Sequence, residues 1–361
     1  MSLQKLILGF SLWLVDVLTF FVKQDPNRIT FVSLTQDHLM SDFFLIDEYL
    51  KKESFDVHYN LIVFEKNWMG DLKYFFNCLK QLIDLKKSRL VIINDNNFVI
   101  SHRKPKKTKV LQVWHACGAI KKFGNEIHRQ YPIRNYDAIL ANAKAWQPIY
   151  ASSFGVREDQ VYVTGMPRLD TLLDWKQQEA KIKEFYCKYP QCKNKKLYLY
   201  APTFRGNIID GFQIQSIDFK KLEDELTDCI FLCKFHPLLK EAHVDSTIVV
   251  NVNEEDLYTL FGVSDCLISD YSSIFLDYSL LNKPMIAYVD DLESYEQTIG
   301  LNVDLRREFP GPVCFDEEQL VESLKHLTID PRLKTFQEKY VVYTDGKNTE
   351  RVVSLIRELM E

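Results

Sequence analysis

Short runs of apolar and β-branched residues recur along the whole chain, and the segments that separate them carry apolar residues at helical spacing. Such runs predict buried strands, and strands that alternate with helices predict a parallel sheet. The expected strands are "RITFVSL", "VHYNLIVF", "RLVIIND", "KVLQVWH", "AILANA" and "VYVTG", followed by "KLYLYAPTF", "DCIFLCKFH", "STIVVNV", "DCLISD", "PMIAYVD" and "PVCF". Helices are expected over 71–87 and 144–155. The pattern therefore predicts an α/β protein with two parallel sheets.

A charged, lysine-rich segment at 175–196 separates the two series of strands. A chain of 361 residues has the length of two domains. We expect an N-terminal domain over 1–190 and a C-terminal domain over 191–361, with a last helix that can pack back on the N-terminal domain. Both are expected to be Rossmann-like, with parallel sheets that face a cleft.

The apolar run at 6–22 is 17 residues long and contains Asp16, so it falls short of the about 20 residues that span a bilayer. No small-residue cleavage site follows it, which argues against a secretory signal. Wound as a helix, the segment carries one narrow seam formed by Lys5, Gly9, Leu12, Asp16, Thr19 and Lys23. The helix is therefore either a core or domain-packing helix or one that lies in a membrane interface.

Charge and cysteine content narrow the class of protein. The formal net charge of −5 argues against a dedicated nucleic-acid binder, so no nucleic-acid partner is expected. Cations nevertheless gather at 101–109 and 193–196, either as solvated loops or as contacts with an anionic lipid or polymer. The 8 cysteines form no C-x2-C pairs and several lie in apolar runs, which indicates a reduced cytoplasmic protein.

Motifs for several common chemistries are absent from the sequence. There is no G-x-G-x-x-G, Walker A, H-E-x-x-H or G-x-S-x-G motif. The D-x-D motif that clamps a metal and a nucleotide in many transferases is also absent, so no metal and no separate cofactor are implied.

The segment "WHACGAIKKFG" places His115 at the end of a predicted strand, ahead of a small-residue turn and of Lys121 and Lys122. An imidazole that titrates near neutral pH can act as a general base, and two lysines suit an anionic substrate. The alternative is an ordinary strand end that is followed by a solvated lysine pair.

The segment "CLISDYSSIFLDYSLLNKPMIAY" reads as a buried strand that leads into a helix, with Ser272 or Ser273 placed to cap the first turn. Backbone N–H groups and hydroxyls at such a point suit an anion. Thr203 and Arg205 follow a second strand, and His236 ends a third. Because the carboxyl ends of parallel strands meet at one edge, these residues are expected to converge there. Each also has a structural interpretation, as a helix cap, a loop salt bridge or a strand-end histidine.

These segments, together with "TGMPRLD", "APTFRG", "KFHPLL" and "PGPV", occur in an order that resembles the CDP-glycerol glycerophosphotransferase family, whose members prime and extend teichoic acids. The resemblance covers roughly residues 105–330. It implies the GT-B fold, with an N-terminal acceptor domain and a C-terminal domain that binds the CDP-polyol donor. It also implies transfer without a metal and peripheral attachment to the inner face of the cell membrane.

Carried over residue by residue, the resemblance implies that His115 is the base and that His236 is a second essential histidine near the donor diphosphate. Four residues match donor-phosphate positions: Thr203, Arg205, Ser272 and Ser273. There are two departures. The family commonly has a Gly–Thr/Ile–Pro turn where this chain has Ala116, Cys117 and Gly118, and it often has an Arg–Gly pair where this chain has Ile299 and Gly300. Lys121 and Lys122 suit an acceptor that is itself a phosphodiester on a lipid carrier.

The expected reaction transfers glycerol or ribitol phosphate from CDP-glycerol or CDP-ribitol to a hydroxyl of a lipid-linked acceptor and releases CMP. Family polymerases often carry an additional N-terminal region, so this shorter chain favours a priming or short-chain transferase. Two alternatives stay open: a GT-B glycosyltransferase that uses a nucleotide sugar, and a non-catalytic scaffold of wall-polymer assembly. The presence of His115 and His236 counts against the scaffold.

Overall fold

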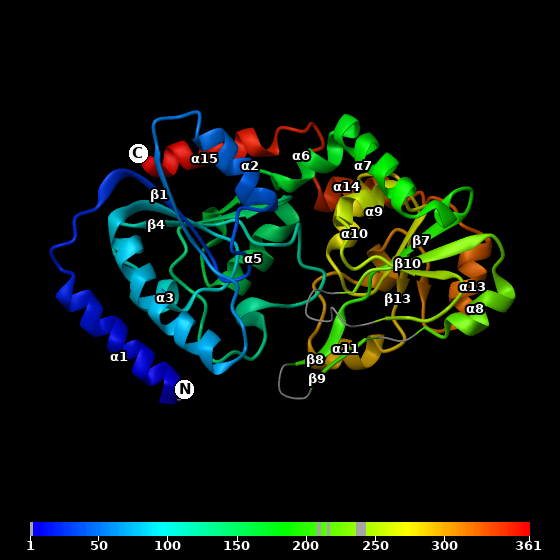
Figure 1. Cartoon of the computed structure of the whole chain (residues 1–361), viewed down its shortest axis with the longest axis horizontal. Helices are drawn as coiled ribbons and strands as arrows, with labels where there is room; N and C mark the ends of the chain where they lie inside the picture. The colour runs from blue at the N-terminus through cyan, green and yellow to red at the C-terminus, as the bar shows by residue number, and fades with distance from the viewer. Residues whose placement is uncertain (1–2, 208–210, 215–216, 236–242) are drawn as a thin grey trace. The chain divides into compact units, whose positions relative to one another are not determined.

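The computed structural model describes residues 3–207, 211–214, 217–235 and 243–361 (Figure 1). The chain forms two compact units. Unit 1 comprises Met1–Cys117, Phe123–Asp170 and Val342–Glu361, and unit 2 comprises Gly118–Lys122 and Thr171–Val341. The long part of unit 1 therefore ends earlier than residue 190, and the chain returns to unit 1 at its C-terminus.

Unit 1 is built on a six-stranded parallel sheet in the order β2-β1-β3-β4-β5-β6. The strands are β1 (Asp25–Ser33), β2 (Asp56–Leu61), β3 (Ser88–Ile93), β4 (Lys109–Gln112), β5 (Ala138–Ala141) and β6 (Val161–Val163). All four residues of β5 are buried, and β3 is buried at every position except Arg89. A parallel strand that is covered on both faces needs such continuous apolar runs, which is why the sequence predicted these strands correctly.

Helices flank the sheet of unit 1. They are α1 (Leu3–Leu18), α2 (Ser41–Leu50), α3 (Trp68–Lys87), α4 (Phe98–Arg103), α5 (Gln147–Phe154), α6 (Arg168–Leu173, which ends in unit 2) and α15 (Asn348–Met360), with short 3₁₀ turns at Gly124–Glu126, Lys144–Trp146 and Glu158–Gln160. The side chain of Asn67 caps α3, and Gly155 ends α5 with a left-handed φ of 64°. The terminal helix α15 packs on α2 (Figure 1).

Helix α1 turns its polar seam toward the protein and its apolar side outward. It lies along α3 (Figure 1) and buries Leu8 and Leu12, while Asp16 forms a 2.7 Å ion pair with Lys86 of α3. Its exposed apolar residues are Leu6, Ile7, Phe10, Trp13, Leu14, Val17 and Leu18. A core helix is therefore excluded, because it would hide these side chains, whereas the contact with α3 agrees with a helix that packs on the domain.

Among the helices that the structure describes, none is both long enough and apolar enough to cross a membrane.

Unit 2 is built on a second six-stranded parallel sheet, in the order β11-β10-β7-β12-β13-β14. Its strands are β7 (Lys196–Tyr200), β10 (Cys229–Cys233), β11 (Val249–Asn251), β12 (Cys266–Ser269), β13 (Met285–Tyr288) and β14 (Val313–Cys314). An antiparallel hairpin, which the sequence did not predict, joins β8 (Phe204–Asn207) to β9 (Gly211–Ile214). The prediction of two parallel, Rossmann-like sheets of the GT-B class is confirmed.

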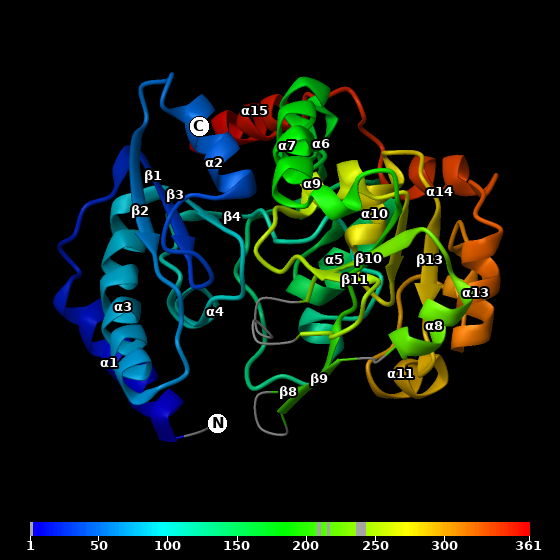
Figure 2. The same cartoon turned by 45° about the vertical axis from the view of Figure 1, so that its right-hand side comes forward.

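The helices of unit 2 are α7 (Trp175–Lys188), α8 (Phe219–Glu225), α9 (Leu257–Val263), α10 (Ile274–Ser279), α11 (Leu292–Thr298), α12 (Leu305–Glu308), α13 (Glu317–Lys325) and α14 (Leu333–Tyr340), with a 3₁₀ turn at Pro190–Cys192. Helices α7 and α9 pack together (Figure 2), as do α8 and α13. A cluster of buried side chains from β7, β10, β12 and β13 and from α8 and α13 forms the core.

Each sheet has a point where the strand order reverses: between β1 and β3 in unit 1, and between β7 and β12 in unit 2. In open α/β sheets, ligands bind outside the carboxyl ends of the strands at such a switch point. Thr203 and Arg205 follow β7, and Ser272 and Ser273 follow β12, whereas His115 follows β4, the neighbour of β3.

Candidate active site

His115 lies on an exposed turn three residues beyond the end of β4. Its ring packs against the indole of Trp114, with 3.9 Å between ring centroids, and its Nδ1 lies 3.2 Å from the carbonyl oxygen of Asn94, which follows β3. A carbonyl only accepts hydrogen bonds, so Nδ1 carries the proton in this contact. The lone pair then resides on Nε2, which is the form of the ring that can accept a proton.

The turn that presents His115 is strained. Trp114 has a φ of 63°, in the left-handed region that costs a bulky residue roughly 1–3 kcal/mol. Its N–H donates to Oε1 of Gln112 at 2.9 Å. Its carbonyl accepts from Nη2 of Arg168 at 3.0 Å, and the carbonyl of His115 accepts from Nη1 of Arg168 at 2.6 Å. These contacts hold the backbone of the turn in place.

Arg168 is itself fixed by a buried carboxylate. Its guanidinium forms an ion pair with Asp42, and its backbone N–H donates to Oδ1 of Asp42 at 2.7 Å. Asp42 is 3% exposed, in the first turn of α2. The sequence predicted no role for Arg168, which begins α6 shortly after β6, because its partner at position 42 is remote in sequence.

In unit 2, Arg205 lies at the centre of a network that joins the loops after β7, β12 and β13. Its Nη1 donates to Asp270 at 2.7 Å, and its Nε donates to Asp291 at 2.7 Å. The ring centroids of Tyr271 and Tyr295 lie 4.9 and 5.1 Å from the guanidinium, and the two rings stack at 3.7 Å. The sequence predicted a phosphate contact for Arg205 but did not predict that two carboxylates would already engage its guanidinium.

The charges of this network shift the pKa values of its members. Burial alone would lower the pKa of Arg205, but the hydrogen bond with Asp291 and the charge of Asp270 outweigh burial and raise it. Burial alone would raise the pKa of Asp291, but hydrogen bonds from Arg205 and Tyr271 outweigh burial and lower it. Both groups are therefore held in their charged forms.

Thr203 belongs to the same network. Its backbone N–H and its hydroxyl each donate to Asp270 at 2.9 Å. Ser272 and Ser273, half-buried, follow Asp270 on the loop between β12 and α10. The hydroxyl of Ser272 lies 3.4 Å from the backbone N–H of Ile274, whereas Ser273, at the N-cap position, makes no side-chain cap bond within the described structure. The structure therefore brings Thr203, Arg205, Ser272 and Ser273 to the switch point of unit 2.

Lys121 and Lys122 lie in unit 2 although His115 lies in unit 1. Lys121 forms an antiparallel bridge with Leu301, and the N–H of Lys122 donates to the carbonyl of Gly300 at 3.0 Å. Burial lowers the pKa of Lys121; nearby Asp270 opposes this shift and Arg205 adds to it. Lys121 thus lies beside the Arg205 network, which its position in the sequence did not indicate.

His236 lies outside the described residues. Within the described part of the chain, no group of three or more His, Cys, Asp or Glu side chains has the arrangement of a metal site. All 8 cysteines are free thiols in the structure, and Cys187 is the exposed one among them.

Comparison with known proteins identifies the family to which the chain belongs. A family model described as CDP-glycerol:poly(glycerophosphate) glycerophosphotransferase matches residues 15–358. A teichoic acid ribitol-phosphate primase of Bacillus spizizenii is 30% identical over 385 residues, which cover 99% of this chain and 98% of the relative. A teichoic acid glycerol-phosphate primase of Bacillus subtilis is also 30% identical, over 75% of this chain and 74% of its own length.

A solved structure of the wall teichoic acid polymerase TagF has a similar fold. It superimposes with a TM-score of 0.73 at 22% sequence identity, and the match covers 93% of this chain and 90% of that chain. At this identity the likeness concerns the fold alone.

Proposed function

Because the chain belongs to the CDP-glycerol:poly(glycerophosphate) glycerophosphotransferase family, we propose that His115 and the Arg205 network serve the transfer of a polyol phosphate. The protein is a transferase of teichoic acid synthesis that moves a polyol phosphate from a CDP-polyol to a wall-polymer acceptor. The nucleotide-sugar glycosyltransferase and the non-catalytic scaffold are thereby set aside.

The contact between His115 and Asn94 is the observation that carries the catalytic role. In the reaction, an acceptor hydroxyl attacks the polyol-bearing phosphorus, a new P–O bond forms, and the bond to the bridging oxygen breaks so that CMP departs. Nε2 of His115 takes the hydroxyl proton as the attack proceeds. The Asn94 carbonyl at 3.2 Å fixes the tautomer, and Arg168 fixes the turn. The enzyme otherwise acts by positioning its reactants.

The donor diphosphate is proposed to bind at the switch point of unit 2. Hydroxyls and backbone N–H groups at Thr203, Ser272 and Ser273 are donors for phosphate oxygens, and Lys121 supplies positive charge beside them. Arg205 is proposed to hold Asp270 and Asp291 in position as well as to meet the phosphate. His236 stays a predicted donor contact. The acceptor role of Lys121 and Lys122 stays a prediction, and we add a donor role for Lys121 because it lies beside Asp270 and Arg205.

Transfer is proposed to need no metal. Asp270 and Asp291 are both ion-paired with Arg205, and Lys121 adds a second positive charge near Asp270, so cations of the protein already accompany these carboxylates. Developing charge on the phosphate is then met by cations and N–H donors of the chain. Turnover that persists in excess chelator is the expected result, and turnover that is restored only by added Mg²⁺ would overturn this part of the proposal.

The membrane is proposed as the surface on which the enzyme works, from the cytoplasmic side. The outward apolar face of α1 includes Phe10, Trp13 and Leu14, a face typical of a helix that lies in the membrane interface. Binding to anionic vesicles that weakens with salt is expected, because surface charges are screened within about 8–10 Å at physiological ionic strength. Absence of binding to such vesicles at low salt would contradict it.

The test of the reaction is CMP release in the presence of a lipid-linked acceptor. Purified full-length protein is given CDP-glycerol or CDP-ribitol in parallel, with a nucleotide sugar as the comparison donor. Release of CMP from one CDP-polyol, together with labelled polyol phosphate in the lipid fraction, is expected and identifies the polyol. Transfer from the nucleotide sugar alone would contradict the proposed function.

A further inference from the structure

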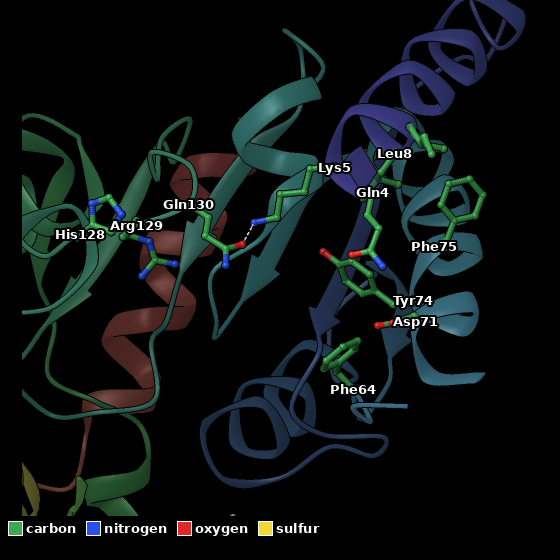
Figure 3. Close-up of a pocket in the computed structure, with 11 residues that line it drawn as sticks. Gln4, Lys5, Leu8, Phe64, Asp71, Tyr74, Phe75, His128, Arg129 and Gln130 are labelled. Carbon is green, nitrogen blue, oxygen red and sulfur yellow. Dashed lines mark hydrogen bonds between the residues drawn. The ribbon is translucent and has the colours of Figure 1, made fainter. Parts of the chain in front are cut away.

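A pocket of about 800 Å³ opens on unit 1 (Figure 3), and His115 is not among the residues that line it. Helix α1 contributes Lys5 and Leu8 to its lining, α3 contributes Asp71, Tyr74 and Phe75, and the loop at 128–130 contributes three polar residues. Figure 3 shows Lys5 reaching from α1 to Gln130, with which it forms a hydrogen bond. The pocket therefore brings together segments that are far apart in sequence.

The pocket lies at the same edge of the sheet as His115. Phe64 and the first turns of α3 follow the carboxyl end of β2, and the loop at 128–130 follows β4. His115 also follows β4, and its partner Asn94 follows β3. This edge is where ligands of a parallel sheet bind. A molecule that is held in the pocket can thus extend along one edge toward His115.

The polar side of the pocket is built for an anion. Lys5 and Arg129 both lie against the ring of Tyr131, at 5.1 and 5.9 Å from its centroid. Burial, together with the like charge of Arg129, lowers the pKa of Lys5. Nε of Arg129 is buried and has no hydrogen-bond partner among the described residues. The positive charges of Lys5 and Arg129 oppose each other, and a phosphate bound beside both would offset that repulsion.

The other side of the pocket is apolar and continues onto exposed apolar surface. Ile7, Leu8, Phe64 and Phe75 line it, and the neighbouring residues of α3 include Trp68, 73% exposed. Asp71 is the single carboxylate among the described lining residues. A ligand with a phosphate at one end and a hydrocarbon chain at the other matches this division.

We propose that the pocket binds the phosphate that joins the acceptor to its lipid, with Lys5 and Arg129 on the phosphate and the side chains of α1 and α3 on the first part of the hydrocarbon chain. The inference rests on the proposed function, because it takes the acceptor to be lipid-linked. It assigns the membrane-facing side of unit 1 a specific role: the enzyme selects its acceptor by the lipid phosphate and presents the far end of that acceptor to His115.

The proposal is tested with vesicles of three compositions: phosphatidylcholine alone, phosphatidylcholine with phosphatidylglycerol, and phosphatidylcholine with a polyprenyl phosphate at equal surface charge. Wild-type protein should bind the polyprenyl phosphate vesicles at least about tenfold more tightly than the phosphatidylglycerol vesicles, since a hydrogen bond to a charged group is worth about that factor or more. Lys5→Gln combined with Arg129→Gln should abolish the preference and leave phosphatidylglycerol binding in place. The matched control, Lys52→Ala combined with Lys87→Ala, removes two exposed cations near the opposite edge of the sheet and should keep the preference.

Kinetic measurements on the same variant test the pocket independently of the proposed transfer reaction. In the pocket variant, KM for a lipid-linked acceptor should rise at least about tenfold, whereas KM for the CDP-polyol and turnover on a water-soluble acceptor without the lipid phosphate should not change. Equal loss of binding to both anionic vesicles, or a wild-type protein without preference, would overturn the pocket assignment while leaving the transfer reaction intact. A wild-type protein that shows the preference but transfers no polyol phosphate would overturn the proposed function and support the pocket.

Discussion

At the scale of single residues, the role of His115 depends on one backbone carbonyl. The Asn94 oxygen at 3.2 Å requires the proton on Nδ1 and so prepares Nε2 as a base. His115→Ala should therefore keep donor affinity, since the proposed donor site lies in unit 2, and should lower turnover by about 10²–10⁴-fold, the usual share of general-base catalysis. CMP release and CDP-polyol binding measured on the same preparation check this.

The thermal stability of His115→Ala is the control for this experiment. The His115 side chain is exposed, so the alanine variant should melt at the parental temperature. A stable variant that releases CMP at the parental rate in the presence of acceptor would show that His115 is an architectural residue and that the base lies elsewhere.

A second residue-scale prediction concerns Asp95, the neighbour of Asn94. Its carboxylate accepts a 2.6 Å hydrogen bond from the N–H of Leu34, yet its Oδ1 is buried and has no partner in the described structure. Burial raises its pKa from 3.8 to about 7. Between pH 4 and 7 the unfolded chain ionises at this position while the folded chain stays protonated, so Asp95 lowers stability as the pH rises through that window.

Asp95→Asn removes this pH dependence because an amide does not ionise. The variant should match the parent near pH 4 and exceed it near pH 7 by more than about 1 kcal/mol in the free energy of unfolding. Denaturant titrations at both pH values measure the difference, with the exposed Asp224→Asn as the comparison. A variant that is less stable than the parent at pH 7 would mean that Asp95 is ionised in the folded protein.

At the scale of elements, the strands were predictable and the contacts at their ends were only partly so. Apolar runs such as those of β3 and β12 identify strands that are buried on both faces, because burial there is a local requirement of the sequence. The hairpin of β8 and β9 was not predicted because its short strands carry no such apolar run. The pairing of Arg205 with Asp270 and Asp291 was not predicted because the partners lie 65 and 86 positions away in the sequence.

The start of α10 gives the element-scale prediction. Ser272→Ala combined with Ser273→Ala removes two hydroxyls from the switch point of unit 2 and should weaken CDP-polyol binding. Stability should fall by no more than about 1 kcal/mol, because Ser272 makes only a long 3.4 Å contact to Ile274 and Ser273 makes no side-chain cap bond in the described structure. Calorimetric donor titration and thermal melting measure the two effects.

A matched control is available in the same unit. Ser294→Ala removes an exposed hydroxyl from α11 and should leave donor affinity unchanged. Donor affinity that is equal in the double variant and the parent would remove the two serines from the phosphate site.

At the scale of the whole molecule, sequence order and spatial order diverge at two places. The segment Gly118–Lys122 pairs within unit 2 directly after the His115 turn of unit 1, and α15 belongs to unit 1 after the chain has completed unit 2. Neither event changes the local apolar pattern, so the sequence could indicate two α/β units but not which short segments each would take. Lys121 is an example. Its acceptor role was expected because it is near His115 in the sequence, whereas its neighbours in space are Asp270 and Arg205.

The return of α15 to unit 1 depends on Asp170, which gives the last prediction. Its carboxylate accepts from the backbone N–H groups of Asn348 and Thr349 at 3.0 and 2.7 Å and from the Thr349 hydroxyl at 2.7 Å. An acidic group there satisfies unpaired donors of the first turn and suits the positive end of the helix. Asp170→Ala should therefore cost about 2 kcal/mol and loosen α15.

Hydrogen exchange measures the loss of stability at the individual amides of α15. Amides of α15 should lose protection in Asp170→Ala, while CDP-polyol affinity stays at the parental value because the proposed donor residues lie in unit 2. The matched variant Asp174→Ala removes a carboxylate that caps α7 through a 3.4 Å contact with Gln177 and should leave α15 protected. Unchanged protection of α15 in Asp170→Ala would mean that the apolar contacts of Val352, Val353 and Ile356 hold the helix without its cap. Because those side chains are buried and the cap orders only the first turn, we expect the loss of protection to be greatest at the start of α15 and to fade toward Met360.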